Sequence, residues 1–146
     1  MNRRPFFYGW LMLPAVTLVS ICTSPGQTYG IAVFNPYLRE ALGLSSSELS
    51  GAYAAGTILA SLPLTYVGAL MDRYGPRRVL VGVVFLFGAT CLGVTQVAGL
   101  FTLFLAFFFL RLLGQGAMSM LAHNALAMWF NRRLGLASGL ANVGIA

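Results

Sequence analysis

Residues 68–78 read GALMDRYGPRR and join two long apolar runs, residues 49–71 and 79–97. Glycine is permissive just after one helix and proline fits the first turn of the next, so the Gly-Pro pair predicts a tight turn between two helices. Crossing the ~30 Å hydrocarbon layer of a membrane as a helix takes about 20 apolar residues, and each run is about that long. The stretch therefore predicts a helical hairpin whose two arms span a membrane.

Further apolar runs lie on both sides of this hairpin, so the same argument extends along the chain. The predicted segments are spanning helices at about residues 7–34, 49–72, 77–97 and 100–128, a loop at 129–134 and the start of a fifth helix at 135–146. The fold class that follows is an all-α integral membrane bundle over residues 1–146. The fifth run is too short to cross, so we expect this bundle to be an incomplete part of a larger one.

Composition supports a membrane protein. Hydrophobic residues make up 58% of the chain and charged residues 8%, against roughly 25% charged in soluble domains. The net charge is +6, from nine basic and three acidic residues. The basic residues are all arginine and lie in small groups between apolar runs, so no nucleic-acid partner is expected. Cys22 and Cys91 lie inside apolar runs and indicate no disulfide. Neither a metal-ligand cluster nor a positioned nucleophile is recognisable, so we expect no enzyme, no cofactor and no metal site.

Local signals mark where the helices begin and break. Ser45 with Glu48 forms a predicted capping box at the start of the second helix. Pro25 and Gly26 predict a break or kink in the first helix. The apolar stretch that begins the chain is longer than the core of a signal peptide and no small-residue cleavage site follows it, so we interpret it as an uncleaved first span.

The arginines predict the orientation, because cytoplasmic connections carry the excess of positive charge. Seven arginines fall on alternate connections and one, Arg39, falls on the other side. The seven are Arg3, Arg4, Arg73, Arg77, Arg78, Arg132 and Arg133. We therefore predict a multi-pass protein of the plasma (bacterial inner) membrane with a cytoplasmic N-terminus.

Arg111 is the costliest residue of the sequence. It lies about eleven residues into the fourth helix, hence ~16 Å deep, near the bilayer midplane. A guanidinium there costs roughly 2.5 to 3.5 kcal/mol, so it should face protein or a wet cavity. Two interpretations stay open: an anion-binding group that donates two parallel hydrogen bonds to a carboxylate, or a structural pairing with an acid or with free carbonyls.

Polar residues accompany Arg111. Gln115 and Ser119 follow it at four-residue steps, within about an 80° arc of a regular helix. Gln27 ends a similar row of hydroxyl residues in the first helix. The tentative substrate-binding residues are therefore Arg111, Gln115, Ser119 and Gln27, although Ser and Thr hydroxyls can also simply bond their own backbone. His123 stands without a ligating neighbour and is interpreted as a packed or interfacial residue.

The hairpin turn also resembles a family motif. Asp72 in the last helical turn opposes the negative end of the helix dipole, so something must compensate its charge. The spacing of its glycines, Asp-Arg pair and basic pair closely resembles the motif between helices 2 and 3 of the major facilitator superfamily. This resemblance implies a latch that holds the cytoplasmic side shut, formed by Gly68, Asp72, Arg73, Gly75, Arg77 and Arg78.

A second stretch resembles one branch of that superfamily. Residues 129–144, WFNRRLGLASGLANVG, are similar to the opening of helix 5 in the monocarboxylate-porter and oxalate–formate antiporter-like branch. Arg132 and Arg133 would anchor the cytoplasmic interface, and Gly135 with Gly139 form a small-xxx-small face on which helices approach closely.

The resemblance implies a function. The chain would be part of the N-terminal half of a transporter whose C-terminal half is missing, working in the lipid bilayer by alternating access. Its substrate would be a small organic anion such as a monocarboxylate, coupled to a proton or a counter-anion. Two alternatives stay open: a non-transporting scaffold or assembly subunit, and a small homodimeric exporter. The exporter would need a membrane-embedded carboxylate, whereas the three acidic residues lie in loops or at helix ends.

Overall fold

The computed structural model describes residues 9–130, 135–136 and 138–139. Over these residues the chain is helical, without a β-strand. Its elements are α1 (Gly9–Cys22), the 3-10 turn η1 (Ser24–Gly26), α2 (Thr28–Leu42), α3 (Ser46–Tyr74), α4 (Pro76–Val94), α5 (Leu100–Phe109), the π-helical segment η2 (Leu110–Met118) and α6 (Ser119–Trp129). The predicted all-α fold class is confirmed.

Three helices are long and apolar enough to cross a membrane: Ser46–Tyr74, Pro76–Val94 and the continuous stretch Leu100–Met128. The chain is therefore a multi-pass membrane protein. The first predicted span is broken, as expected, at Pro25 and Gly26. Residues 9–42 form two shorter helices, α1 and α2, separated by η1.

The first span breaks where Pro25 and Gly26 interrupt its ladder of hydrogen bonds. Proline has no N–H to donate, and the bonds that replace the ladder are short-range ones. Gly26 N donates to the Thr23 carbonyl at 2.8 Å and the Thr23 hydroxyl to the Ser20 carbonyl at 2.6 Å. Beyond the break, α2 runs to Leu42 rather than to about residue 34, and it ends at Gly43 with a left-handed φ of 62°.

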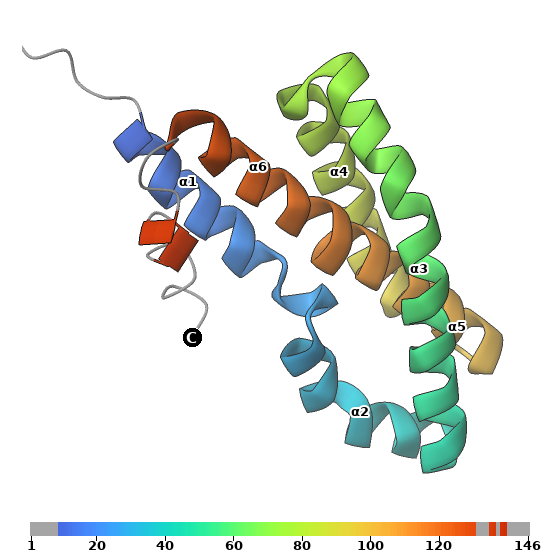
Figure 1. Ribbon diagram of the computed structural model, residues 1–146. Coiled ribbons are helices and arrows are strands. Elements are labelled where there is room, and N and C mark those ends of the chain that lie inside the picture. Colours follow the sequence, from blue (N-terminus) through green and yellow to red (C-terminus); the bar gives the residue numbers. More distant parts are fainter. Residues whose placement is uncertain (1–8, 131–134, 137, 140–146) are drawn as a thin grey trace, which may run out of the picture.

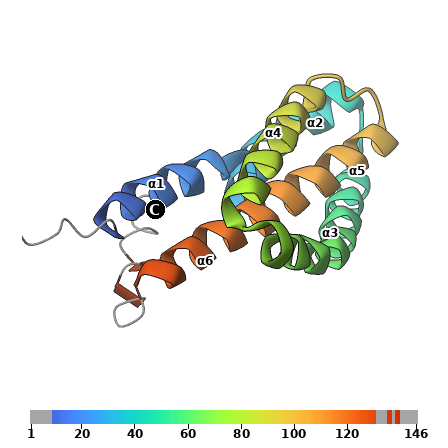
Figure 2. The same ribbon diagram turned by 90° about the horizontal axis from the view of Figure 1, so that it is seen from above.

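The stretch α5–η2–α6 lies at the centre of the bundle. Helix α1 runs along α6, and α3 runs along α5 (Figures 1 and 2). Helix α4 packs against η2, and its Val83 and Phe87 belong to the same buried cluster as Leu113 and Ala117. Because every other helix packs on this central stretch, its side chains supply most of the buried core.

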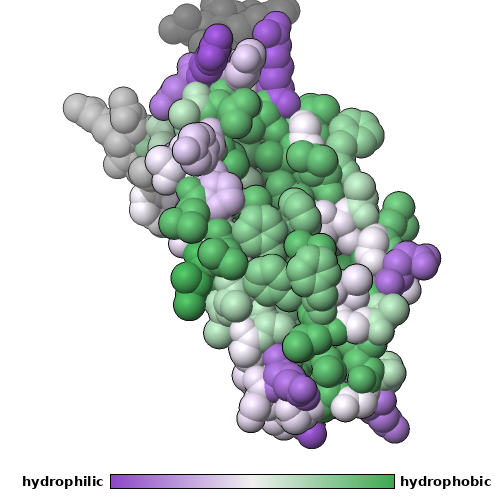
Figure 3. Space-filling view, turned by 90° about the vertical axis from the view of Figure 1, so that its right-hand side faces the viewer, coloured by the Kyte–Doolittle hydropathy of each residue, from purple (hydrophilic) through white to green (hydrophobic). Residues whose placement is uncertain are grey.

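The outer surface is strongly apolar. Hydrophobic residues cover most of the middle of one face and hydrophilic residues gather towards its two ends (Figure 3). Large side chains such as Phe85, Leu92 and Phe101 are at least 71% exposed. Such a band suits hydrocarbon, with the polar ends at the two membrane interfaces.

Two junctions have the predicted local chemistry. At the start of α3, Glu48 N donates to the Ser45 hydroxyl at 3.2 Å, and Ser45 N donates to the Glu48 carboxylate at 2.8 Å, which is a complete capping box. Gly75, with a φ of 83°, ends α3 and immediately precedes Pro76, the first residue of α4. A single residue, Gly75, therefore joins the two arms of the hairpin, and its positive φ is a conformation that favours glycine.

Candidate functional site

Arg111 lies where η2, α3 and the start of α2 meet. Its Nε donates to the Thr57 hydroxyl at 3.1 Å, and one terminal nitrogen donates to the Thr28 hydroxyl at 3.1 Å. The guanidinium carbon lies 5.0 Å from the centre of the Tyr53 ring. The Tyr53 hydroxyl also donates to Thr28, at 3.2 Å. We call these four residues the Arg111 cluster.

The Arg111 cluster leaves the guanidinium charge open to an anion. Thr57 and Thr28 are neutral acceptors, and among the residues that the structure describes no carboxylate faces Arg111. A guanidinium carries five N–H donors in a planar fork, and the two hydroxyls engage two of its nitrogens. The cation–π contact with Tyr53 fixes the plane of the fork. Such a group can bind a carboxylate by donating two parallel hydrogen bonds to it.

The helix around Arg111 is wider than an ordinary α-helix. Residues Leu110–Met118 are π-helical, a form with i→i+5 hydrogen bonds that often marks functional sites. The expected 80° arc for Arg111, Gln115 and Ser119 assumed 3.6 residues per turn, and that assumption is wrong for this segment. A four-residue step falls slightly short of one turn of a π-helix, whereas it slightly exceeds one turn of an α-helix, so the three positions still lie on one side of the segment. Of the three side chains, Gln115 is exposed.

Gln27 and Ser119 do come together. The Gln27 amide nitrogen lies 3.4 Å from the Ser119 hydroxyl and 3.1 Å from the Thr23 hydroxyl. The Ser119 hydroxyl lies 3.4 Å from the Gly114 carbonyl. His123 Nδ1 lies 2.8 Å from the Ser119 carbonyl, so this histidine extends the polar contacts along α6. These contacts adjoin the Arg111 cluster because Gln27 and Thr28 are neighbours in the chain, and we call the two sets together the polar track.

Close backbone packing positions this track. Gly26 is buried against η2, and a Cβ at this position would collide with the Leu110 carbonyl oxygen and lie 3.0 Å from the Gly114 Cα. Glycine therefore allows the break in the first span to touch the π-helical segment directly. That contact brings the next residues of the chain, Gln27 and Thr28, within reach of Ser119 and Arg111.

Thr28, Tyr53 and Thr57 were not predicted as site residues. Tyr53 and Thr57 are four residues apart and so share one face of α3, which is a signal that the sequence did contain. Thr28 directly follows Gln27, but its role depends on the geometry of the break. None of the three residues could be assigned to the Arg111 site from the sequence, because their contacts depend on how three separate helices pack.

The residues of the predicted latch lie at the turn between α3 and α4. Asp72, Arg73, Arg77 and Arg78 are exposed, and the Arg73 guanidinium carbon lies 5.5 Å from the centre of the Tyr74 ring. Gly68, about one turn before Asp72 by helical spacing, has open space where a Cβ would stand. The turn is thus free to contact another segment.

Arg132 and Arg133 of the second predicted motif lie outside the described residues. Gly135 and Gly139 are helical and exposed, with nothing near the position of a Cβ. No group of three or more potential metal ligands occurs within the described part of the chain.

Comparison with known proteins gives two matches. Residues 17–146 match the Major Facilitator Superfamily. The chain is also 28% identical, over 138 residues, to a protein named oxalate:formate antiporter from Oxalobacter formigenes. The similarity covers 92% of this chain and 32% of that protein, so the chain spans about a third of the relative's length. No solved structure matches the chain significantly.

Proposed function

The chain belongs to the major facilitator superfamily, and from this premise we propose that it serves the secondary transport of small organic anions by alternating access. The predicted superfamily membership is confirmed. Membership of a transporter family also agrees with the expectation that the chain is not an enzyme.

The observation that carries the proposal is the Arg111 cluster. A guanidinium within a membrane span is costly unless it is paired, yet the partners that the structure gives it are two hydroxyls and an aromatic ring. An anion bound to Arg111 would compensate the charge, and the fork geometry favours a carboxylate. Gln27 and Ser119, at the other end of the polar track, supply amide and hydroxyl groups for the remaining polar atoms of a substrate.

The similarity to the Oxalobacter formigenes protein supports the same class of substrate. That relative is named for oxalate and formate, both of which are small carboxylates. For the present chain we propose the class only: a small organic anion that exchanges with another anion or moves together with a proton.

Binding of formate or oxalate to the purified chain tests the role of Arg111. Charge-assisted hydrogen bonds contribute about 1.5 to 3 kcal/mol, so Arg111→Gln should weaken binding by roughly 10- to 100-fold. Arg39→Gln, which removes an exposed arginine from the last turn of α2, should leave binding unchanged. Arg111→Lys, which keeps the charge but loses the fork, should bind with intermediate affinity.

Equal binding by the native chain and Arg111→Gln, with both chains folded by circular dichroism, would contradict the anion-binding role. A variant that fails to fold while Arg111→Lys folds and binds normally would instead favour the structural interpretation of Arg111.

We also propose that the α3–α4 turn is cytoplasmic and acts as the latch. Asp72 and the arginines around it are exposed at the end of the hairpin, so they can pair with a later segment when the cytoplasmic side closes. The distribution of arginines supports this orientation and a bacterial inner-membrane location.

A further inference from the structure

A long groove opens between α3 and α4, with η2 as its floor. Its volume is about 740 Å³. The walls are almost wholly apolar, formed by residues such as Val67 and Leu70 from α3, Leu86 from α4 and Leu112 from η2. Arg78 and Tyr74 line its end at the α3–α4 turn.

The shape of the groove suits a hydrocarbon chain better than a compact metabolite. On α4 the lining positions run from Arg78 to Thr90, which is about 18 Å at 1.5 Å per residue. Both walls belong to helices that can span a membrane, so the groove lies at the depth of the acyl region of a bilayer. Its almost wholly apolar lining offers an acyl chain more favourable contacts than it offers water.

The polar end of the groove is positively charged. Arg73, Arg77 and Arg78 stand against one acid, Asp72, which leaves a net charge of +2 at the turn (3 − 1). All four side chains are exposed, and Tyr74 with Arg73 forms the aromatic and basic pair typical of a membrane interface. Basic groups at the interface attract anionic headgroups.

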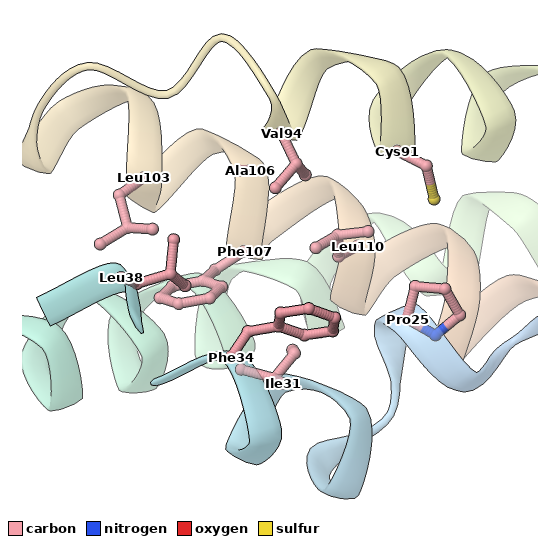
Figure 4. A pocket seen from close by; sticks show the side chains of 10 residues that line it. All are labelled: Pro25, Ile31, Phe34, Leu38, Cys91, Val94, Leu103, Ala106, Phe107 and Leu110. Carbon is pink, nitrogen blue, oxygen red and sulfur yellow. The ribbon is translucent and has the colours of Figure 1, made fainter. Parts of the chain in front are cut away.

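We propose that this groove binds an anionic glycerophospholipid, with one acyl chain between α3 and α4 and its phosphate at Arg78. The site is separate from the Arg111 cluster but shares Arg78 with the proposed latch, and lipid binding goes beyond the proposed transport function. A second cavity, of about 260 Å³, lies between α2 and the α4–α5 side (Figure 4). No charged residue lines that cavity, so nothing there would select a headgroup.

Gly82 provides a sharp test of the groove. It lines the groove, and a Cβ at this position would meet no atom within 4 Å. Gly82→Leu therefore places a side chain in the space of the acyl chain, and its Cβ meets no neighbouring atom. Gly88 lies on the same helix with equally open surroundings, but it does not line the groove. Gly88→Leu is thus a matched control with the same change in helix propensity.

The experiment is native mass spectrometry of the purified chain with phosphatidylglycerol or phosphatidylcholine of identical acyl chains. The native chain should retain one phosphatidylglycerol more tightly than phosphatidylcholine. Gly82→Leu should weaken this binding by about tenfold or more, because each buried methylene contributes about fourfold. Arg78→Gln should weaken binding of phosphatidylglycerol by about fivefold and reduce its preference over phosphatidylcholine, whose choline cation already offsets the phosphate charge. Gly88→Leu should bind like the native chain.

Three results would overturn the proposal: equal retention of the two lipids by the native chain, equal retention by Gly82→Leu and Gly88→Leu, or dimers in the native chain that disappear only in Gly82→Leu. The last result would assign the groove to a second copy of the chain. Circular dichroism of each variant ensures that lost binding reflects the groove and not unfolding.

Discussion

The guanidinium of Arg111 depends on neutral partners to keep its place. Thr57 accepts from Nε, while Thr28 accepts from a terminal nitrogen and from Tyr53. These side chains act as positioning residues, because they hold the fork in one plane and leave its charge uncompensated. Replacing any one of them should therefore disturb the position of the Arg111 guanidinium.

Thr57→Val should destabilise the fold by about 1 kcal/mol or more, because the Arg111 Nε–H loses its acceptor while the volume at position 57 hardly changes. Thr65→Val, at an exposed position of the same helix, should have little effect. Unfolding free energies of the two variants in mixed micelles provide the comparison. Equal stability would show that the hydroxyl of Thr57 does not hold Arg111.

Gly26→Ala should destabilise by roughly 1 to 3 kcal/mol, since the added methyl group has to push the break in the first span away from η2. Gly93→Ala, at an exposed position of α4 with open surroundings, should be neutral or stabilising by up to about 1 kcal/mol. Thermal unfolding measures both. If the two substitutions have the same effect, Gly26 does not form a tight contact.

The sequence pointed to Arg111 because charge within an apolar run is conspicuous. It could not identify the partners of Arg111, which lie 54 and 83 positions away along the chain. Hydroxyl residues are common in membrane helices, and only the packing of helices decides which of them meet. Gln27 and Ser119, two of the tentative binding residues, do lie together, but their role in binding stays a prediction.

The type of helix around Arg111 could not be predicted from residue spacing. Spacing arguments assume an ordinary α-helix, and the interval from Leu110 to Met118 departs from it. Nothing in the local sequence forces this form. Contacts with Gly26 and Phe87 surround Gly114 at the middle of the segment, so the neighbouring helices are part of what selects it.

The start of α3 is the opposite case, because its chemistry is local. Ser45→Ala removes the side chain that accepts from Glu48 N and should cost about 1 kcal/mol of stability. Glu48→Gln should retain most of the capping box, since glutamine also serves at this position. Hydrogen exchange of the amides in the first turn of α3 reports the loss directly. Unchanged exchange in Ser45→Ala would mean that the cap contributes nothing.

Across the bundle, the long spans could be predicted because the hydrocarbon thickness fixes how many apolar residues each requires. The division of the first span into two helices could be predicted only in part from the sequence. Pro25 and Gly26 signalled a break, but the extension of α2 to Leu42, past the apolar run and through Arg39, depends on its docking beside α3.

Cysteine labelling in intact cells tests the predicted membrane topology. In a background lacking Cys22 and Cys91, cysteines at positions 77 and 132 should react only with a membrane-permeant reagent, because both arginines are predicted to be cytoplasmic. A cysteine at Glu40 should react with an impermeant reagent as well. Labelling of positions 77 and 132 from opposite sides would refute both the orientation and the cytoplasmic latch.

The break in the first span makes α2 a lever with its pivot beside the charged site. Helix α2 has 15 residues and is therefore about 22 Å long. A rotation of roughly 5° at its base displaces its far tip by about 2 Å over that length. Thr28, the base of the lever, is bonded to Arg111, whereas Leu38 and Leu42 near the far end pack on α3. An anion that re-aims the guanidinium would therefore have to shift this packing to move the opposite end of the helix.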